Sequence, residues 1–244
     1  MDNAMMIGLA RQQTLRQAMD ISANNIANSS TTGFKAEQVL LETNAATRAR
    51  HADGPDRLAF VDEWGVGRDF SQGALQGTGR PLDLAIEGEG FFALETEAGE
   101  RFTRDGRFSL NAEGEIVAAD GARLLDEAGI PIRIVPEGGE IEVRANGEVM
   151  QDGVPVARLA VTRFEAPGEL SKTGDNRYSA PEEAEREIVL APVVRQGFIE
   201  ASNVRPVMEL TRMMEISRTY ASVSKMISQT DELGRKALER LGRP

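Results

Sequence analysis

The sequence of 244 residues contains no cysteine and a single histidine, His51. A chain without cysteine forms no disulfide and no thiolate metal site, and it offers no cysteine nucleophile. His51 lies among Arg48, Arg50 and Asp53 in a polar stretch, a setting typical of a solvated side chain. We therefore expect no metal, no cofactor and no catalytic triad built on histidine.

Aromatic residues make up only 5% of the chain, and no apolar run approaches the roughly 20 residues of a membrane-spanning helix. The opening segment, MDNAMMIGLARQQ, lacks the basic region that begins a cleavable signal peptide. We expect neither such a peptide nor membrane insertion. The formal net charge of −11 also argues against a nucleic-acid partner, because phosphate binding needs clustered lysine and arginine.

Several carboxylates lie close together in the middle of the chain, notably Glu87, Glu89 and Asp105. A glycosidase would need two such groups. Nothing in their spacing separates them from ordinary solvated strand and turn residues, and no paired nucleophile and base accompanies them. The sequence therefore predicts that the protein is not an enzyme.

The first 35 residues predict a helix followed by a turn. Apolar side chains recur at spacings of three and four from residue 1 to about residue 28, and the helix ends among Asn24, Asn25 and Asn28. Asparagine tolerates a left-handed backbone, and Gly33 has the freest backbone just beyond it. Residues 36–72 lose this periodicity and are expected to form an exposed connector.

In residues 73–194 the pattern changes, and apolar residues recur at every second position. Leu82, Leu84 and Ile86 alternate with Asp83 and Glu87, as in a strand buried on one face. Further short apolar runs follow, separated by Asp-Gly and Asn-Gly pairs that are typical of tight turns. We predict an all-β domain here, of sandwich or barrel form, which folds without the rest of the chain.

Residues 195–244 predict a second long helix. Ser202 or Asn203 is placed to cap it, and Pro206 would fall in its first turn, where a missing N–H costs little. The helix is expected to run from about Val204 to Leu241, and from Met213 its apolar residues follow a heptad repeat, as in a coiled coil, that weakens after two heptads. The positions that form this repeat most clearly are Met213, Ile216, Tyr220, Val223 and Ile227.

Four stretches, in this order along the chain, resemble the flagellar rod and hook family, the axial proteins of the bacterial flagellum. They are DISANNIANSSTTGFK at 20–35, TGRPLDLAIEGEGFF at 78–92, TRDGRFSLNAEGEIVAADG at 103–121 and QGFIEASNVRPVMELTRMMEISRTY at 196–220. Within the family, the opening residues and the short connector look most like a proximal-rod member. A distal-rod or hook-type member is the alternative.

The resemblance implies that the terminal helices pair as an antiparallel coiled coil and pack into the rod, with the β domain outside. It implies a subunit of the rod that crosses the periplasm and transmits torque to the hook, exported through the flagellar type III apparatus without a cleaved signal. Its partners would be copies of itself and neighbouring rod proteins. The residues expected to take part in assembly are Asn24, Asn25, Asn28, Thr32, Gly33, Phe34, Lys35, Ser202, Asn203, Val204, Met213, Ile216, Tyr220, Val223 and Ile227.

One hypothesis of another class stays open on the residues alone. A soluble β-sandwich binding module with coiled-coil termini would have the same alternation of helix, strands and helix. Concentration-dependent assembly of the purified protein would separate the two readings.

Overall fold

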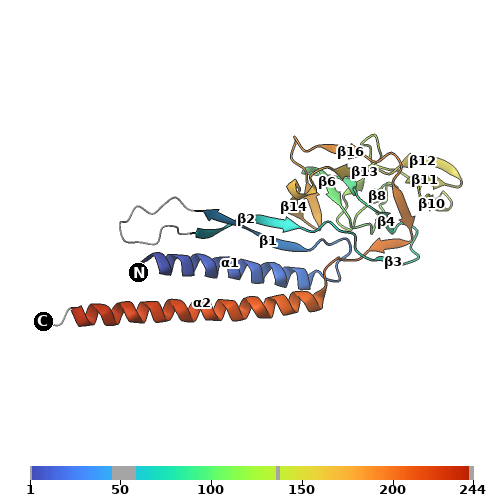
Figure 1. The fold of residues 1–244 in the computed structure, drawn as a ribbon. Helices are drawn as coiled ribbons and strands as arrows, with labels where there is room; N and C mark the ends of the chain where they lie inside the picture. The colour runs from blue at the N-terminus through green and yellow to red at the C-terminus, as the bar shows by residue number, and fades with distance from the viewer. Residues whose placement is uncertain (1, 46–58, 136–137, 242–244) are drawn as a thin grey trace. The chain divides into compact units, whose positions relative to one another are not determined.

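The computed structural model describes residues 2–45, 59–135 and 138–241, which fall into two compact units. Unit 1 consists of residues 1–27, 37–69 and 204–244, and unit 2 consists of residues 28–36 and 70–203. Two helices at the ends of the chain and a β-rich region between them confirm the expected order of elements (Figure 1). His51 lies outside the described residues.

Unit 1 contains two helices and two strands. Helix α1 (Asp2–Ala27) packs against α2 (Pro206–Leu241) and also against strand β1 (Glu37–Ala45). Figure 1 shows α1 between α2 and the strand pair. Strand β1 pairs antiparallel with β2 (Ala59–Arg68). The segment expected to be a connector therefore includes a two-stranded sheet. The sequence leaves either a short strand or a short helix open at Glu37–Thr43, and it gives no signal for the second strand because the apolar residues do not alternate regularly.

The two helices approach closely near the start of α1. The buried positions Gly8, Leu15 and Ser22 lie seven residues apart on α1. A Cβ atom on Gly8 would lie 2.8 Å from Cγ1 of Ile227 on α2, so a small residue is needed there. On α2, all five residues of the heptad repeat are half-buried, whereas most of their neighbours are exposed. The repeat thus marks the more covered face of α2.

Unit 2 is built from short strands in several sheets. The largest sheet runs β14-β15-β6-β5-β9-β8-β7, with β13 also pairing with β5 and β16 with β13, and smaller sheets are β10-β11-β12, β17-β4 and β18-β3. The strands are β3 (Leu75–Gly77), β4 (Leu84–Glu87), β5 (Phe91–Thr96), β6 (Gly99–Thr103), β7 (Ser109–Leu110), β8 (Ile116–Val117), β9 (Arg123–Leu124), β10 (Ile141–Val143), β11 (Glu148–Gln151), β12 (Val154–Arg158), β13 (Val161–Phe164), β14 (Ser171–Gly174), β15 (Arg177–Ser179), β16 (Arg186–Ile188), β17 (Val193–Gln196) and β18 (Phe198–Glu200), with a short 3-10 helix at Pro167–Glu169.

Strand β5 lies at the centre of unit 2. Its side chains alternate between two apolar clusters: Phe92 and Leu94 enter one, and Phe91 and Ala93 enter the other. The second cluster is mainly aromatic, and the Phe91 ring meets the Tyr178 ring edge-on at 5.8 Å between centroids. Because both faces of β5 are covered, its sequence is continuously apolar rather than alternating.

Unit 2 is wider than the 73–194 region expected from the sequence. Strand β4 pairs with β17, whose residues Arg195 and Gln196 lie beyond that limit, and β3 pairs with β18. The segment 28–36 also belongs to unit 2. A sequence pattern finds strands by their own periodicity, and it does not identify the distant partner that completes each sheet.

This wider boundary generates a prediction about fragments. A fragment of residues 73–194 loses half of β17 and all of β18, whereas a fragment of residues 28–203 keeps every segment of unit 2. We expect the shorter fragment to melt at least ~10 °C lower, or without a cooperative transition, because it loses several kcal/mol of packing and pairing. Circular dichroism on heating measures this. Equal melting temperatures would show that segments 28–36 and 195–203 contribute nothing to unit 2.

Candidate assembly surface and ionic junction

The segment that follows α1 makes a tight turn inside unit 2. The backbone N–H of Thr31 donates to the Asn28 carbonyl at 3.1 Å, and the Thr31 hydroxyl donates to Asn28 Oδ1 at 3.2 Å. Gly33 then adopts a φ of 67°, and a Cβ atom there would lie 2.4 Å from the Arg104 carbonyl carbon. Glycine is required at this position for both reasons. The turn delivers the next two side chains into unit 2.

Asn25 connects α1 to β1 within unit 1. Its side-chain amide donates to the Glu37 carbonyl at 2.8 Å and accepts the Glu37 N–H at 3.0 Å, and the residue is fully buried. The amide thus pairs with the backbone as a neighbouring strand would. Asn25 therefore contributes to the fold of a single chain.

Lys35, Arg104 and Glu200 form a buried ionic network, which we call the ionic junction. Lys35 Nζ lies 2.6 Å from Glu200 Oε1, and Arg104 Nη1 lies 3.1 Å from Glu200 Oε2. The exposed fractions of the three side chains are 1%, 3% and 1% respectively. Charges so fully removed from water are stable only when they are paired and hydrogen-bonded.

Other hydrogen-bonding groups of the ionic junction reach the backbone, whereas Arg104 Nε is buried without an acceptor among the described residues. Lys35 Nζ donates to the Ser71 carbonyl at 2.7 Å, and Arg104 Nη2 donates to the Gly88 carbonyl at 2.7 Å. Glu200 Oε1 accepts the Gly73 N–H at 2.8 Å. Burial lowers the pKa of the Arg104 guanidinium, and the Glu200 carboxylate opposes that shift. The junction therefore joins segments that are distant in sequence through a single carboxylate.

Asn203 adds a second connection beside the ionic junction. Its Oδ1 accepts the Ala36 N–H at 2.8 Å, and its Nδ2 donates to the Ser71 carbonyl at 3.1 Å. Phe34, which directly precedes Lys35, is buried, and the Lys172 ammonium lies 4.5 Å from its ring centroid. Ser202 or Asn203 was expected to cap α2, which stays a prediction, and in the structure the Asn203 side chain holds three chain segments together.

The structure places the fifteen expected assembly residues in different environments. Six are buried, eight are half-buried and Asn24 is exposed. The buried ones are Asn25, Thr32, Gly33, Phe34, Lys35 and Val204, and the half-buried ones are Asn28, Ser202, Asn203, Met213, Ile216, Tyr220, Val223 and Ile227. Buried side chains already have partners in their own chain, so an assembly role for them stays a prediction.

Sequence analysis did not single out Arg104 or Glu200. Both lie inside motifs that were recognised, but a charged residue beside a turn usually faces solvent. The sequence does hold one hint that Glu200 is buried. It directly follows the apolar residues Phe198 and Ile199, at a place where the chain passes from strand to helix. Only the burial of both residues against Lys35 reveals their role.

Helix α2 carries exposed apolar side chains on the face away from its heptad repeat. Val207 is 75% exposed, Leu210 is 49% exposed and Met214 is 55% exposed. The spacings of three and four place these three side chains on one side of the helix. Exposed apolar side chains that are neighbours on one side of a helix can form a contact surface for another protein. We call these three side chains the apolar strip.

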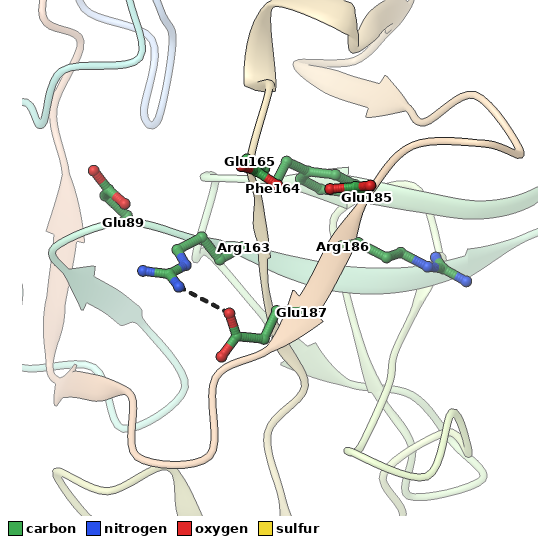
Figure 2. Close-up of a pocket in the computed structure, with 7 residues that line it drawn as sticks. All are labelled: Glu89, Arg163, Phe164, Glu165, Glu185, Arg186 and Glu187. Atoms are coloured by element: carbon green, nitrogen blue, oxygen red, sulfur yellow. Dashed lines mark hydrogen bonds and ion pairs between the residues drawn. The ribbon is translucent and has the colours of Figure 1, made fainter.

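Unit 2 has a surface hollow of about 590 Å³, which Figure 2 shows. Arg163 Nη2 donates to Glu187 Oε2 at 2.8 Å, and Glu165 lies beside Glu185. The Glu165 side chain raises the pKa of the Glu185 carboxyl through a hydrogen bond and charge repulsion. The lining consists of carboxylates, guanidiniums and one phenyl ring, with no hydroxyl, amine or imidazole side chain among the lining residues.

Within the described ranges, no set of three histidine or acidic side chains is arranged to hold a metal ion. Over the same residues, neither helix is both long and apolar enough to span a membrane. The features that distinguish the described part of the chain are thus the ionic junction and the apolar strip.

Comparison with known families identifies three matching regions. Residues 5–35 match "Flagella basal body rod protein", residues 85–151 match "Flagellar hook protein FlgE/F/G D1 domain", and residues 195–240 match "Flagellar basal body rod FlgEFG protein C-terminal". The first and third regions include most of α1 and α2. The second lies within unit 2.

Several curated proteins are similar over the whole chain. The flagellar basal-body rod protein FlgF of Caulobacter vibrioides is 46% identical over 243 residues, covering 100% of this chain and 99% of that protein. FlgF of Rhizobium meliloti is 35% identical, with 99% of both chains covered. The flagellar basal-body rod protein FlgG of Agrobacterium fabrum is 30% identical, with 93% of both covered.

The ionic junction leads to a prediction with a matched control. Lys35 Nζ lies 2.6 Å from a buried carboxylate, and Lys236 Nζ lies 2.6 Å from the Glu232 carboxylate with 61% of the lysine side chain exposed. Lys35→Met removes one of the two cationic partners of the buried Glu200 carboxylate, which keeps Arg104, and should lower the free energy of unfolding of unit 2 by about 2 kcal/mol. Lys236→Met should lower stability by less than ~1 kcal/mol. Denaturant unfolding measures both, and equal small losses would refute the role given to Lys35.

Proposed function

Because the chain belongs to the flagellar basal-body rod protein family, we propose that it is a structural subunit of the rod that assembles through its two terminal helices. The observation that carries this proposal is similarity to FlgF proteins over the full length of the chain, both helices included. The family role is structural, in agreement with the non-enzymatic reading of the sequence. The greater identity to FlgF than to FlgG favours a proximal-rod position, with a distal-rod position as the alternative.

In this proposal α1 and α2 pair as an antiparallel coiled coil, and unit 2 forms a β sandwich or barrel. The close approach of Gly8 to Ile227 supports the pairing, since a residue near the start of α1 meets one in the second half of α2. The paired face is already covered within the chain. Contacts with other copies and with neighbouring rod proteins therefore involve the apolar strip of Val207, Leu210 and Met214.

The distribution of charge supports association through unit 1. Unit 2 contains 25 acidic and 14 basic residues, so copies of unit 2 repel one another. Unit 1 contains 14 of each, and its surface opposes association much less. An apolar strip on a neutral unit can therefore approach its equivalent in a neighbour while the acidic units stay apart.

We further propose that the subunit leaves the cell through the flagellar export apparatus without a cleaved signal and transmits torque as part of the rod. Detection of the intact protein, beginning at Met1, in isolated basal bodies would support this location. Its absence from basal bodies that contain other rod proteins would contradict it.

Leu210→Asp tests whether the apolar strip mediates assembly. It places a carboxylate at a position that is half exposed in the single chain, so the fold should keep its melting temperature while association weakens at least ~10-fold. Ser222→Asp adds the same charge at another exposed position on α2 and serves as the control. Ile227 is unsuitable for this test because it packs against Gly8 in the same chain.

Both variants are compared by sedimentation and by swimming of cells in which each replaces the natural protein. We expect Leu210→Asp cells to build no rod beyond this subunit and not to swim, whereas Ser222→Asp cells swim. Normal swimming with Leu210→Asp would show that the apolar strip is not the assembly surface. It would then favour the binding-module hypothesis if the protein were also absent from basal bodies.

A further inference from the structure

The chain crosses from one unit to the other at four points along the sequence. Residues next to three of these crossing points are hydrogen-bonded to one another within unit 2. Lys35 lies one residue before the end of segment 28–36, Ser71 is the second residue of segment 70–203, and Asn203 is the last. Lys35 and Asn203 both donate to the Ser71 carbonyl, at 2.7 and 3.1 Å. The three connecting segments are therefore bonded to one another before each leaves unit 2.

Glu200 lies at the centre of this arrangement. Its two carboxylate oxygens accept hydrogen bonds from Lys35 Nζ at 2.6 Å, from the Gly73 N–H at 2.8 Å and from Arg104 Nη1 at 3.1 Å. The Glu200 carbonyl also accepts the Gly33 N–H at 2.7 Å. One residue thus binds two of the connecting segments and the loop that carries Arg104, and its own segment is the third connection.

Stability alone does not account for charges at this place. A well-packed apolar cluster of similar volume is often as stable as a buried ion pair, because desolvation offsets most of the attraction. Buried charges differ from an apolar cluster in permitting few arrangements, since every donor needs an acceptor at a defined position. The junction is therefore suited to fixing geometry.

We propose that the ionic junction is a fixed joint, which prevents the three connecting segments from moving independently of the unit 2 core. In the intact protein the connections open only when the whole of unit 2 opens. This proposal concerns the single chain and does not depend on assembly into the rod. The rival explanation is that the junction merely adds to the general stability of unit 2.

Amide hydrogen exchange on the full chain distinguishes the two. The reporters at the joint are the N–H groups of Gly33 and Gly73, which bond to Glu200. The reporters in the core are the N–H groups of Leu125 and Ile132, which bond to Ala93 and Leu124 at 2.9 Å each. In Lys35→Met we expect the core amides to exchange up to about 30-fold faster, in step with the lower stability of unit 2, and the joint amides to accelerate at least about 10-fold more than the core amides.

Asn203→Ala provides a second variant that leaves no charge unpaired, so it should fold even if Lys35→Met does not. It removes the bonds to Ala36 and Ser71 and should speed exchange of the joint amides about 10-fold. Lys236→Met is the control and should change neither set. Equal acceleration of joint and core amides would overturn the proposal in favour of general stability, and unchanged joint amides in Asn203→Ala would overturn it as well.

Discussion

A carboxylate buried in a protein interior is stable only with cationic and N–H partners. In this chain Glu200 has such a carboxylate, and the surrounding segments are placed so that they supply those partners. Its partners come from residues 35, 73 and 104, so the helix that precedes Lys35 has to end at the right place. Gly33 satisfies this need because only glycine allows the backbone to pass so close to Arg104. The conspicuous run of Asn, Thr and Gly after α1 is thus explained by one ionic contact 165 residues away in sequence.

The two units follow different physical rules. Unit 2 is packed around β5, and both faces of that strand are covered. Unit 2 also has more acidic than basic residues. Unit 1 is electrically balanced and leaves large apolar side chains exposed along α2. A monomer that exposes an apolar strip is stabilised further when a partner covers it. The division suits a rod protein, whose helical part associates with its neighbours while its acidic part remains a separate folded body.

Much of this organisation is predictable from the sequence. The positions of both helices follow from periodicity, the start of α2 from Pro206, and its half-buried face from the heptad repeat of Met213 to Ile227. The glycine turn after α1 was also expected from its composition. These features depend on residues that are close in sequence, where propensity and spacing act directly.

The features that were missed depend on distant partners. Strands β1 and β2 stabilise each other by pairing, and neither has a strong pattern alone. Lys35 was expected to take part in assembly because it lies in the stretch 20–35 that resembles the rod and hook family, and its burial follows only from the position of Glu200. The boundaries of unit 2 were too narrow for the same reason, since β17 and β18 complete sheets begun more than 100 residues earlier.

The ionic junction depends on the buried Lys35–Glu200 ion pair, and nuclear magnetic resonance of lysine side chains observes that pair directly. The chain has four lysines, at positions 35, 172, 225 and 236, and a side-chain ammonium is visible at neutral pH only when its protons are protected from water. We expect one slowly exchanging ammonium signal, assigned to Lys35 by its absence in Lys35→Met. Rapid exchange of all four ammonium groups in the folded protein would contradict it.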